Sequence, residues 1–288
     1  MTKQHNSRPL VPVSPQGLDE IALALLKGSG TPNANADAGT VRPAVGIINP
    51  REYIILPSTT HGTYRYPDLL VAKHRLGYDT DVKRAAKELG LHVQNTAQEQ
   101  DGTVYIGEIN WENALKLNAK LGNVTLNIRQ FLDFQELLKA GMGNARKVYD
   151  GAGTKLDSAE LTRMYNEIRE VRDPWRSEWL DNAFFKVSDT VMGTRYGHSL
   201  ASNGTLKAAV TEHLGTHLRE DTWIDESRFN TQGLPTTKSS AQILYYWFPR
   251  DGAVAGFYAD SGGAWLVCGR DPSDTIATLG VRAARAKK

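Results

Sequence analysis

Residues 103–138 read TVYIGEINWENALKLNAKLGNVTLNIRQFLDFQELL. The first seven residues alternate as a strand does, and Asn110 follows them as the cap of a helix over 111–121, which Gly122 ends. A second helix is expected over 127–138, because its apolar residues recur at helical spacing along one stripe. A strand followed by two helices with only a short link between them indicates an α+β domain.

The C-terminal part of the chain consists of short apolar runs separated by turn-forming residues. The runs cover residues 243–248, 254–259, 264–268 and 279–283. Their spacing, and the Pro-, Gly- and Asp-rich sequences between them, predict four strands, so this end of the chain is expected to be all-β.

Two alternating sets of side chains occur within this segment. One set is small or apolar and is expected to form a packed face that buries the only thiol; it comprises Phe257, Ala259, Ser261, Ala264, Leu266 and Cys268. The other set has no shared chemistry and includes Tyr258, Asp260 and Trp265. Such a face is typical of an ordinary half-exposed sheet, and also of a binding surface, where rigid aromatic rings supply contact area at low entropic cost.

The remaining elements are predicted from the same signals. Strands are expected over 44–48 and 53–56. Helices are expected over 67–73, 80–90 and 158–172. Residues 175–185 carry large apolar side chains and are expected to pack on the core. Residues 187–240 are expected to be mostly loop, with one short helix near 206–218.

These patterns divide the chain into three segments. Residues 1–39 are expected to be a flexible arm and linker, because residues 28–39 are too small and polar to bury much surface. Residues 40–102 form an N-terminal α/β segment. Residues 103–288 form the main domain, with a long insertion over about 140–240.

The composition excludes several classes of protein. The 34 Lys and Arg against 32 Asp and Glu give a net charge of +2, and no basic run exceeds the length of Lys287-Lys288, so no nucleic-acid partner is expected. The single cysteine, Cys268, excludes an intrachain disulfide, a Cys-rich zinc site and paired-thiol chemistry. No stretch has the pattern of a signal peptide or a membrane span, so we expect a soluble chain without membrane insertion, whose location the sequence does not indicate.

Three stretches carry a resemblance to a known family. Residues 104–138, with WENA from Trp111 and LNIRQF from Leu126, resemble the opening of the C-type lectin fold in its formylglycine-generating-enzyme-like branch, and residues 279–285 resemble its closing strand. Between them, residues 254–278 resemble the variable region of diversity-generating retroelement proteins, particularly archaeal and viral ones. In that family, mutagenesis directed at adenines in asparagine codons randomises selected surface positions on a lectin-fold scaffold.

The resemblance implies a C-type-lectin-like fold with two helices packed on a small antiparallel sheet, a long insertion and an all-β C-terminal end. It also implies a non-enzymatic protein that displays a hypervariable surface to a protein or cell-surface ligand. The enzymatic branch needs a pair of cysteines, and the calcium-binding lectins need Glu-Pro-Asn and Trp-Asn-Asp motifs; the chain has one cysteine and neither motif, so no cofactor is expected. The expected ligand-binding residues are Tyr246, Asp251, Tyr258, Asp260, Trp265, Val267, Gly269, Asp271, Ser273 and Asp274.

Two other functions stay open. His213 and His217 lie four residues apart, so on a helix they would share one face and could hold the metal ion of a metal-assisted hydrolase. A structural virion or assembly protein, in which the C-terminal sheet is only a scaffold, is the other alternative. Metal analysis of the purified protein would test the first, and selective variation among homologous copies would test the second.

Overall fold

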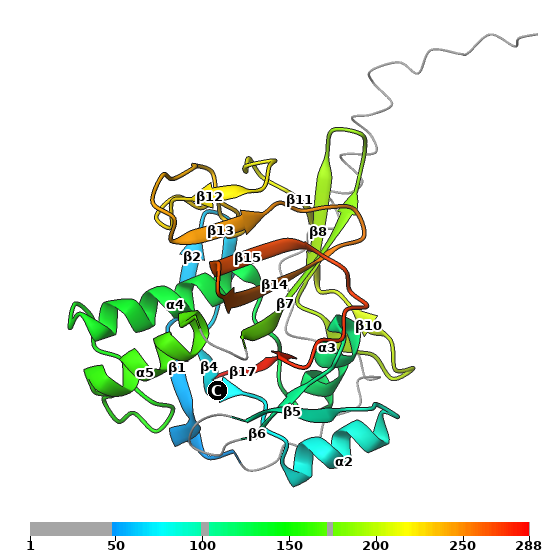
Figure 1. Cartoon of the computed structure of the whole chain (residues 1–288). Helices are drawn as coiled ribbons and strands as arrows, with labels where there is room; N and C mark the ends of the chain where they lie inside the picture. Colours follow the sequence, from blue (N-terminus) through cyan, green and yellow to red (C-terminus); the bar gives the residue numbers. More distant parts are fainter. Residues whose placement is uncertain (1–47, 99–103, 172–174, 288) are drawn as a thin grey trace, which may run out of the picture. The chain divides into compact units, whose positions relative to one another are not determined.

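The computed structural model describes residues 48–98, 104–171 and 175–287 (Figure 1). Helices and mixed sheets together make an α+β fold, as the sequence predicts. All of these residues belong to one unit of the chain, Val41–Lys288. The predicted arm and linker over 1–39, and the strand predicted over 44–48 apart from its last residue, lie outside the described residues.

Each α-helix in the described ranges begins after an Asp or Asn cap. The helices are α2 (Thr80–Glu88), α3 (Trp111–Lys120), α4 (Ile128–Met142) and α5 (Ser158–Arg169), and a short 3-10 helix, η1, covers Pro50–Glu52. The caps of the four α-helices are Asp79, Asn110, Asn127 and Asp157. Each cap side chain accepts a hydrogen bond from the backbone N–H three residues further on, which satisfies a donor that the helix itself leaves open. These helices confirm the predictions over 80–90, 111–121, 127–138 and 158–172.

An eight-stranded mixed sheet occupies the centre of the fold. The strand order is β11-β8-β7-β14-β15-β13-β12, and β16 pairs with β7 beside this path. The bounds are β7 (Arg176–Lys186), β8 (Met192–Tyr196), β11 (Val210–His213), β12 (Thr222–Ile224), β13 (Leu244–Trp247), β14 (Val254–Asp260), β15 (Gly263–Arg270) and β16 (Leu279–Gly280). Neighbours are antiparallel except for two parallel pairs, β13 with β15 and β16 with β7. The strands predicted over 243–248, 254–259 and 264–268 are therefore confirmed, as is the packing role of 175–185.

The other described strands form a smaller sheet and three hairpins. The sheet has the order β1 (Tyr53–Leu56), β4 (Leu69–Arg75), β17 (Arg282–Ala286), and the hairpins are β2 (Thr59–His61) with β3 (Tyr64–Tyr66), β5 (Gln94–Gln98) with β6 (Val104–Gly107), and β9 (Ser199–Leu200) with β10 (Leu206–Lys207). Strand β4 comes from the predicted segment 40–102 and β17 from segment 103–288, so the two segments share this sheet.

Two predicted helices are wrong. Residues 67–73 mostly belong to β4, the central strand of the smaller sheet, where pairing on both edges outweighs the helical spacing of their apolar residues. Residues 206–218 contain β10 and β11 instead of a helix. In β11 intermediate and exposed residues alternate, as expected for a strand at the edge of a sheet.

Helices pack on both faces of the central sheet. One face packs on α4 and α5 through a core that contains Phe131, Leu161 and Phe257; the rings of Phe131 and Phe257 lie 5.3 Å apart. The other face carries Trp179 of β7, which packs in a second core with residues of α2 and α3, among them Leu117. Figure 1 shows α4 with α5 and α3 on different sides of β7 and β14.

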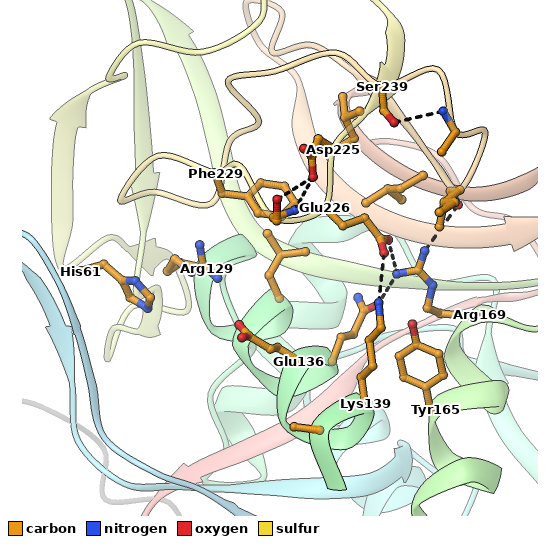
Figure 2. A pocket seen from close by; sticks show the side chains of 18 residues that line it. His61, Arg129, Glu136, Lys139, Tyr165, Arg169, Asp225, Glu226, Phe229 and Ser239 are labelled. Carbon is orange, nitrogen blue, oxygen red and sulfur yellow. Dashed lines mark hydrogen bonds and ion pairs between the residues drawn. The ribbon is translucent and has the colours of Figure 1, made fainter. Parts of the chain in front are cut away.

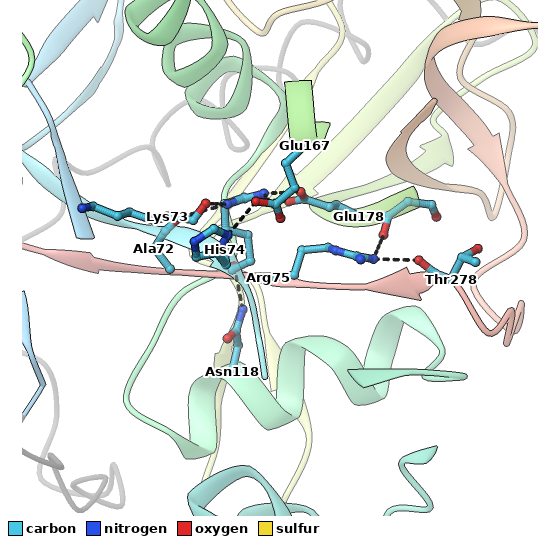
Figure 3. A network of polar contacts seen from close by, with 10 residues as sticks. Ala72, Lys73, His74, Arg75, Asn118, Glu167, Glu178 and Thr278 are labelled. Carbon is cyan, nitrogen blue, oxygen red and sulfur yellow. Dashed lines mark hydrogen bonds and ion pairs between the residues drawn. The ribbon is translucent and has the colours of Figure 1, made fainter. Parts of the chain in front are cut away.

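A buried polar network joins the two sheets (Figure 3). Arg282 of β17 donates from Nη2 and Nε to the carboxylate of Glu178 in β7, at 2.6 and 3.0 Å, and from Nη1 to the carbonyl oxygens of Ala72 and Lys73 in β4. Glu167 of α5 lies 3.8 Å from Arg282. Arginine suits this position because its planar fork can bond a carboxylate and two carbonyls at once.

Candidate ligand-binding surface

The hairpin β14–β15 has two chemically different faces. Its inner face is buried, as predicted, and comprises Phe257, Ala259, Ala264, Leu266 and Cys268. Burial raises the pKa of the Cys268 thiol well above its usual range, which leaves the thiol protonated and unreactive at neutral pH. Ser261, which the alternation placed with this set, is exposed because it lies in the turn between the two strands.

The outer face carries four aromatic side chains in one line across four strands. Trp223 of β12 pairs in register with Tyr245 of β13, Tyr245 with Trp265 of β15, and Trp265 with Tyr258 of β14. We call these four residues the aromatic row. Successive ring centroids lie 5.1, 4.8 and 5.6 Å apart, and the Tyr258 and Trp265 rings are stacked with an angle of 20° between their planes. All four side chains are only half-buried.

Two further tryptophans extend this surface. The Trp247 ring lies 6.4 Å from Trp265, and the Trp175 ring lies 5.4 Å from Tyr258. Both are half-buried. The result is a continuous, partly exposed aromatic surface that large, rigid side chains dominate, as they do in many recognition surfaces.

The turn between β14 and β15 fixes the central ring of the row. Asp260 Oδ1 accepts hydrogen bonds of 2.8 Å from the Trp265 indole Nε1–H and from the backbone N–H of Gly262. A Cβ atom at position 262 would lie 2.7 Å from Trp265 Cζ2, so only glycine leaves room for the indole here. The orientation of Trp265 is therefore set by the turn itself.

Two arginines flank the row, and each is paired with an aspartate. Arg270 lies over the Tyr258 ring at 5.8 Å and bonds Asp274 at 3.1 Å. Arg250 lies over the Trp247 ring at 5.7 Å and bonds Asp221 at 2.8 Å.

The nearby charges affect the pKa of the Tyr258 hydroxyl. Burial and the negative charge of Asp260 raise the pKa of Tyr258 to about 12, although Arg270 opposes the change. The Tyr258 hydroxyl therefore stays neutral across the physiological range.

Two of the expected ligand-binding residues are buried. Tyr246 is fully buried in the core with α4 and α5, because Leu244 and Tyr246 share the inner face of β13 and leave Tyr245 and Trp247 on the outer one. Val267 is on the outer face but only 3% exposed.

The register partners of Val267 are Gly256 on β14, which has no side chain, and Trp247 on β13. The Trp179 ring and the stem of Arg270 lie 3.8 Å from the place a Cβ would take at Gly256. Val267 therefore lies among larger side chains of β13, β7 and β15. Both predictions of exposure, for Tyr246 and for Val267, are therefore wrong.

The other expected residues divide into two groups. Tyr258, Asp260 and Trp265 lie together, and Asp274 joins them through Arg270. Asp271 and Ser273 are exposed in the following turn, where Ser273 donates to Asp271 from its backbone N–H and its hydroxyl. Gly269 is half-buried, and a Cβ atom at this position would lie 3.2 Å from the Phe248 carbonyl oxygen. Asp251 is exposed at the far end of β14 and accepts a hydrogen bond from the Lys186 backbone.

The sequence interpretation missed four residues of the surface. The run 244–247 alternates, and once Leu244 is placed inside, Tyr245 and Trp247 must share the outer face. Alternation along this run therefore predicts the face on which Tyr245 and Trp247 lie. Trp175 and Trp223 carried no such signal, because Trp175 only reaches the row through three-dimensional packing and β12 lies in a region predicted to be loop.

A pocket lies on the inner side of the central sheet. It is a hollow of about 830 Å³. Figure 2 shows the side chains that line it, which come from α4, from α5, from residues 224–244 and from His61 of β2. Its volume is ordinary for a small-molecule site. However, Glu226 lies 2.5 Å from Arg169 and 3.9 Å from Lys139, and Arg129 bonds Asp133 at 2.6 Å, so most of its charges are matched inside the protein.

The two histidines of the hydrolase alternative do not share a helical face. His213 ends strand β11, and His217 lies in the loop that follows, where its Nδ1 lies 2.7 Å from the Gly215 carbonyl oxygen. Within the described ranges, no group of three or more His, Cys, Asp or Glu side chains is placed to hold a metal ion. Their helical arrangement was the reason for that alternative, and it is absent.

Comparison with family models, with curated proteins and with solved structures finds no match to this chain. No helix among the described residues is long and apolar enough to cross a membrane.

Proposed function

We propose that the protein is a non-enzymatic ligand-binding protein whose recognition surface is the aromatic row and the turns beside it. The observation that carries the proposal is the difference in burial and chemistry between the two faces of the hairpin β14–β15. The inner residues are buried in the core, while the outer aromatic residues are half-buried and contact one another. Aromatic side chains at such positions are the usual anchors of protein interfaces.

We further propose that the scaffold is C-type-lectin-like and that a retroelement diversifies the surface. The stretches that carry the resemblance form β6, α3 and α4 at one end and β16 and β17 at the other. These ends meet in space, since Val124 bridges Ala284 through paired backbone hydrogen bonds and Asn118 donates to the Arg282 carbonyl oxygen. A scaffold closed in this way would support the inner face of the hairpin β14–β15. The side chains on its outer face could then be substituted without loss of the fold.

A pair of display libraries tests the recognition surface. The first randomises outer positions 258, 260, 265, 271, 273 and 274, and the second randomises inner positions 257, 259, 264, 266 and 268. Sorting for protease resistance should recover many folded members of the first library and few of the second, because core volumes tolerate little change. Folded members of the first library should then yield binders to an arbitrary protein target. Equal survival of the two libraries would overturn the proposal.

The retroelement part has its own test in the genome. The locus should carry a near-repeat of the codons for residues 254–285 beside a reverse transcriptase gene. Copies of the protein from one population should differ at outer positions and agree at inner ones. A locus without such a repeat, and with differences spread evenly over both sets, would contradict this part while leaving the binding surface intact.

A further inference from the structure

Among the described residues, one negative charge beside the aromatic row has no oppositely charged partner. Arg270 is paired with Asp274 and Arg250 with Asp221, so these four residues contribute no net charge. Asp260 bonds only Trp265 and Gly262, and no cation of the described residues forms an ion pair with it. Among the described charged side chains that contact the aromatic row or Trp247, the uncompensated one is therefore Asp260, at the end of β14.

The geometry of Asp260 leaves one oxygen for a ligand. Both hydrogen bonds end on Oδ1, which fixes the carboxylate, while Oδ2 accepts none within the described ranges. Asp260 is partly exposed. Its side chain is thus oriented before any partner arrives, which reduces the entropic cost of binding.

The surroundings favour a cation at this oxygen. The Trp265 and Tyr258 rings beside it are large and apolar, so a partner that covers them excludes water and strengthens an ion pair with the carboxylate. Aromatic rings also attract cations electrostatically. The negative charge of Asp260 also contributes, after burial, to the raised pKa of the neighbouring Tyr258.

From this geometry we infer that the partner is a protein segment that places a lysine or arginine side chain against Asp260 Oδ2, flanked by apolar residues that cover the aromatic row. The inference rests on the proposed recognition surface and names the chemistry that this surface selects. An acidic partner would be repelled by Asp260. A neutral glycan could use the same oxygen as an acceptor, but it would leave the charge unmatched.

Selection from a random peptide library on the full-length protein tests the inference. Peptides are selected on the wild-type protein and depleted on Trp265→Ala, whose fold is verified by its melting temperature. Enriched peptides should share a Lys or Arg next to aromatic or aliphatic residues. Replacement of that basic residue by Gln or norleucine should weaken binding about tenfold or more, as expected for loss of a charged hydrogen bond.

Asp260→Asn is the decisive variant, because asparagine keeps an oxygen for Trp265 and Gly262 and removes only the charge. It should weaken the selected peptides about tenfold or more and abolish the dependence of binding on salt. The matched control is Asp225→Asn: Asp225 also accepts a hydrogen bond from a backbone N–H two residues on, but it lines the hollow on the other side of β12. Binding should be unchanged in this control.

The possible failures are distinguishable. If no peptide, protein or glycan prefers the wild type over Trp265→Ala, the proposed recognition surface itself is wrong. If the enriched peptides are neutral or acidic, if Asp260→Asn binds them as well as the wild type, or if only glycans bind, the surface stands and the basic partner is overturned.

Discussion

The guanidinium of Arg282 and the carboxylate of Glu178 form two hydrogen bonds, of 2.6 and 3.0 Å, in the interior between the two sheets. Arg282 is 2% exposed and Glu178 5%, so neither group can turn to water if the other is lost. This pair connects β17, which closes the smaller sheet, to β7, which supports the hairpin of the recognition surface.

Arg282→Met should lower the free energy of unfolding by about 3–5 kcal/mol, because it leaves the Glu178 carboxylate buried without a partner. The double variant Arg282→Met, Glu178→Leu should recover much of the loss, since it removes both buried charges. Urea unfolding at neutral pH measures both values. A loss below about 1 kcal/mol in the single variant would show that the pair does not hold the sheets together.

Tyr246→Phe should leave the protein as stable as the wild type or up to about 1 kcal/mol more stable. The Tyr246 hydroxyl is buried and has no hydrogen-bond partner among the described residues, so its removal relieves an unsatisfied group. Binding should not change, because the side chain faces the core. Thermal melting and peptide affinity check the two parts, and a clear loss of affinity would return Tyr246 to the binding surface.

The neighbours Phe257 and Tyr258 should respond oppositely to alanine. Phe257→Ala should cost about 3–5 kcal/mol of stability, because it opens a cavity beside Phe131. Tyr258→Ala should cost only about 1 kcal/mol, the value of its ring contacts, while removing most of the binding. Paired denaturation and affinity measurements decide this. Similar stability losses at both positions would mean that the hairpin has no free face.

Cys268 should react with a thiol reagent only when the protein unfolds. The side chain is fully buried and the pKa of the thiol is raised by burial, so little thiolate exists in the native state. The labelling rate should rise steeply with urea, in parallel with unfolding. Rapid labelling in native buffer would show that the inner face is open. Cys268→Ser should destabilise the protein by about 1–3 kcal/mol, because it buries a hydroxyl group in an apolar site.

The stability should fall in acid partly through Glu167. Burial acts to raise the pKa of this carboxyl, but the 2.6 Å hydrogen bond to His74 and the charge of Arg282 outweigh it, so the folded-state pKa lies below its usual value. A lowered pKa means that ionised Glu167 stabilises the fold above its unfolded pKa, and that this contribution is lost as the pH falls through the folded-state pKa. The difference in unfolding free energy between wild type and Glu167→Gln should therefore shrink as the pH is lowered below about 4.5, the ordinary value for a glutamate. A constant difference would contradict the assignment.

The helices could be predicted from sequence because their signals are local. Asp79, Asn110, Asn127 and Asp157 cap their helices through bonds that span three residues, and such pairs are visible in the sequence itself. Strand β4 could not be predicted in this way. Its type depends on pairing with β1 and with β17, and the second partner is more than 200 positions away.

The inner face of the recognition hairpin was also predictable, since alternation alone places Phe257 and Leu266 together. The aromatic row was only half predictable. Tyr258 and Trp265 follow from the same alternation, but Tyr245 joins them because β13 lies parallel beside β15, a pairing between strands that are not consecutive. The burial of Val267 was not predictable either, because its neighbours in the sheet, Trp247 of β13 and Gly256 of β14, follow only from the strand pairing.

The pairing of β17 with β4 also governs how the protein is made. Arg282 bonds the Ala72 carbonyl across 210 positions of chain, so during translation β4 waits with one edge open until residues 282–286 have left the ribosome. Contacts of such separation form slowly, and open strand edges invite aggregation in the meantime. The hairpin β14–β15 is synthesised within this interval, before the sheet can close. A sequence change in this hairpin therefore arises in a chain whose smaller sheet is still open, the stage at which partly folded chains are most prone to aggregate.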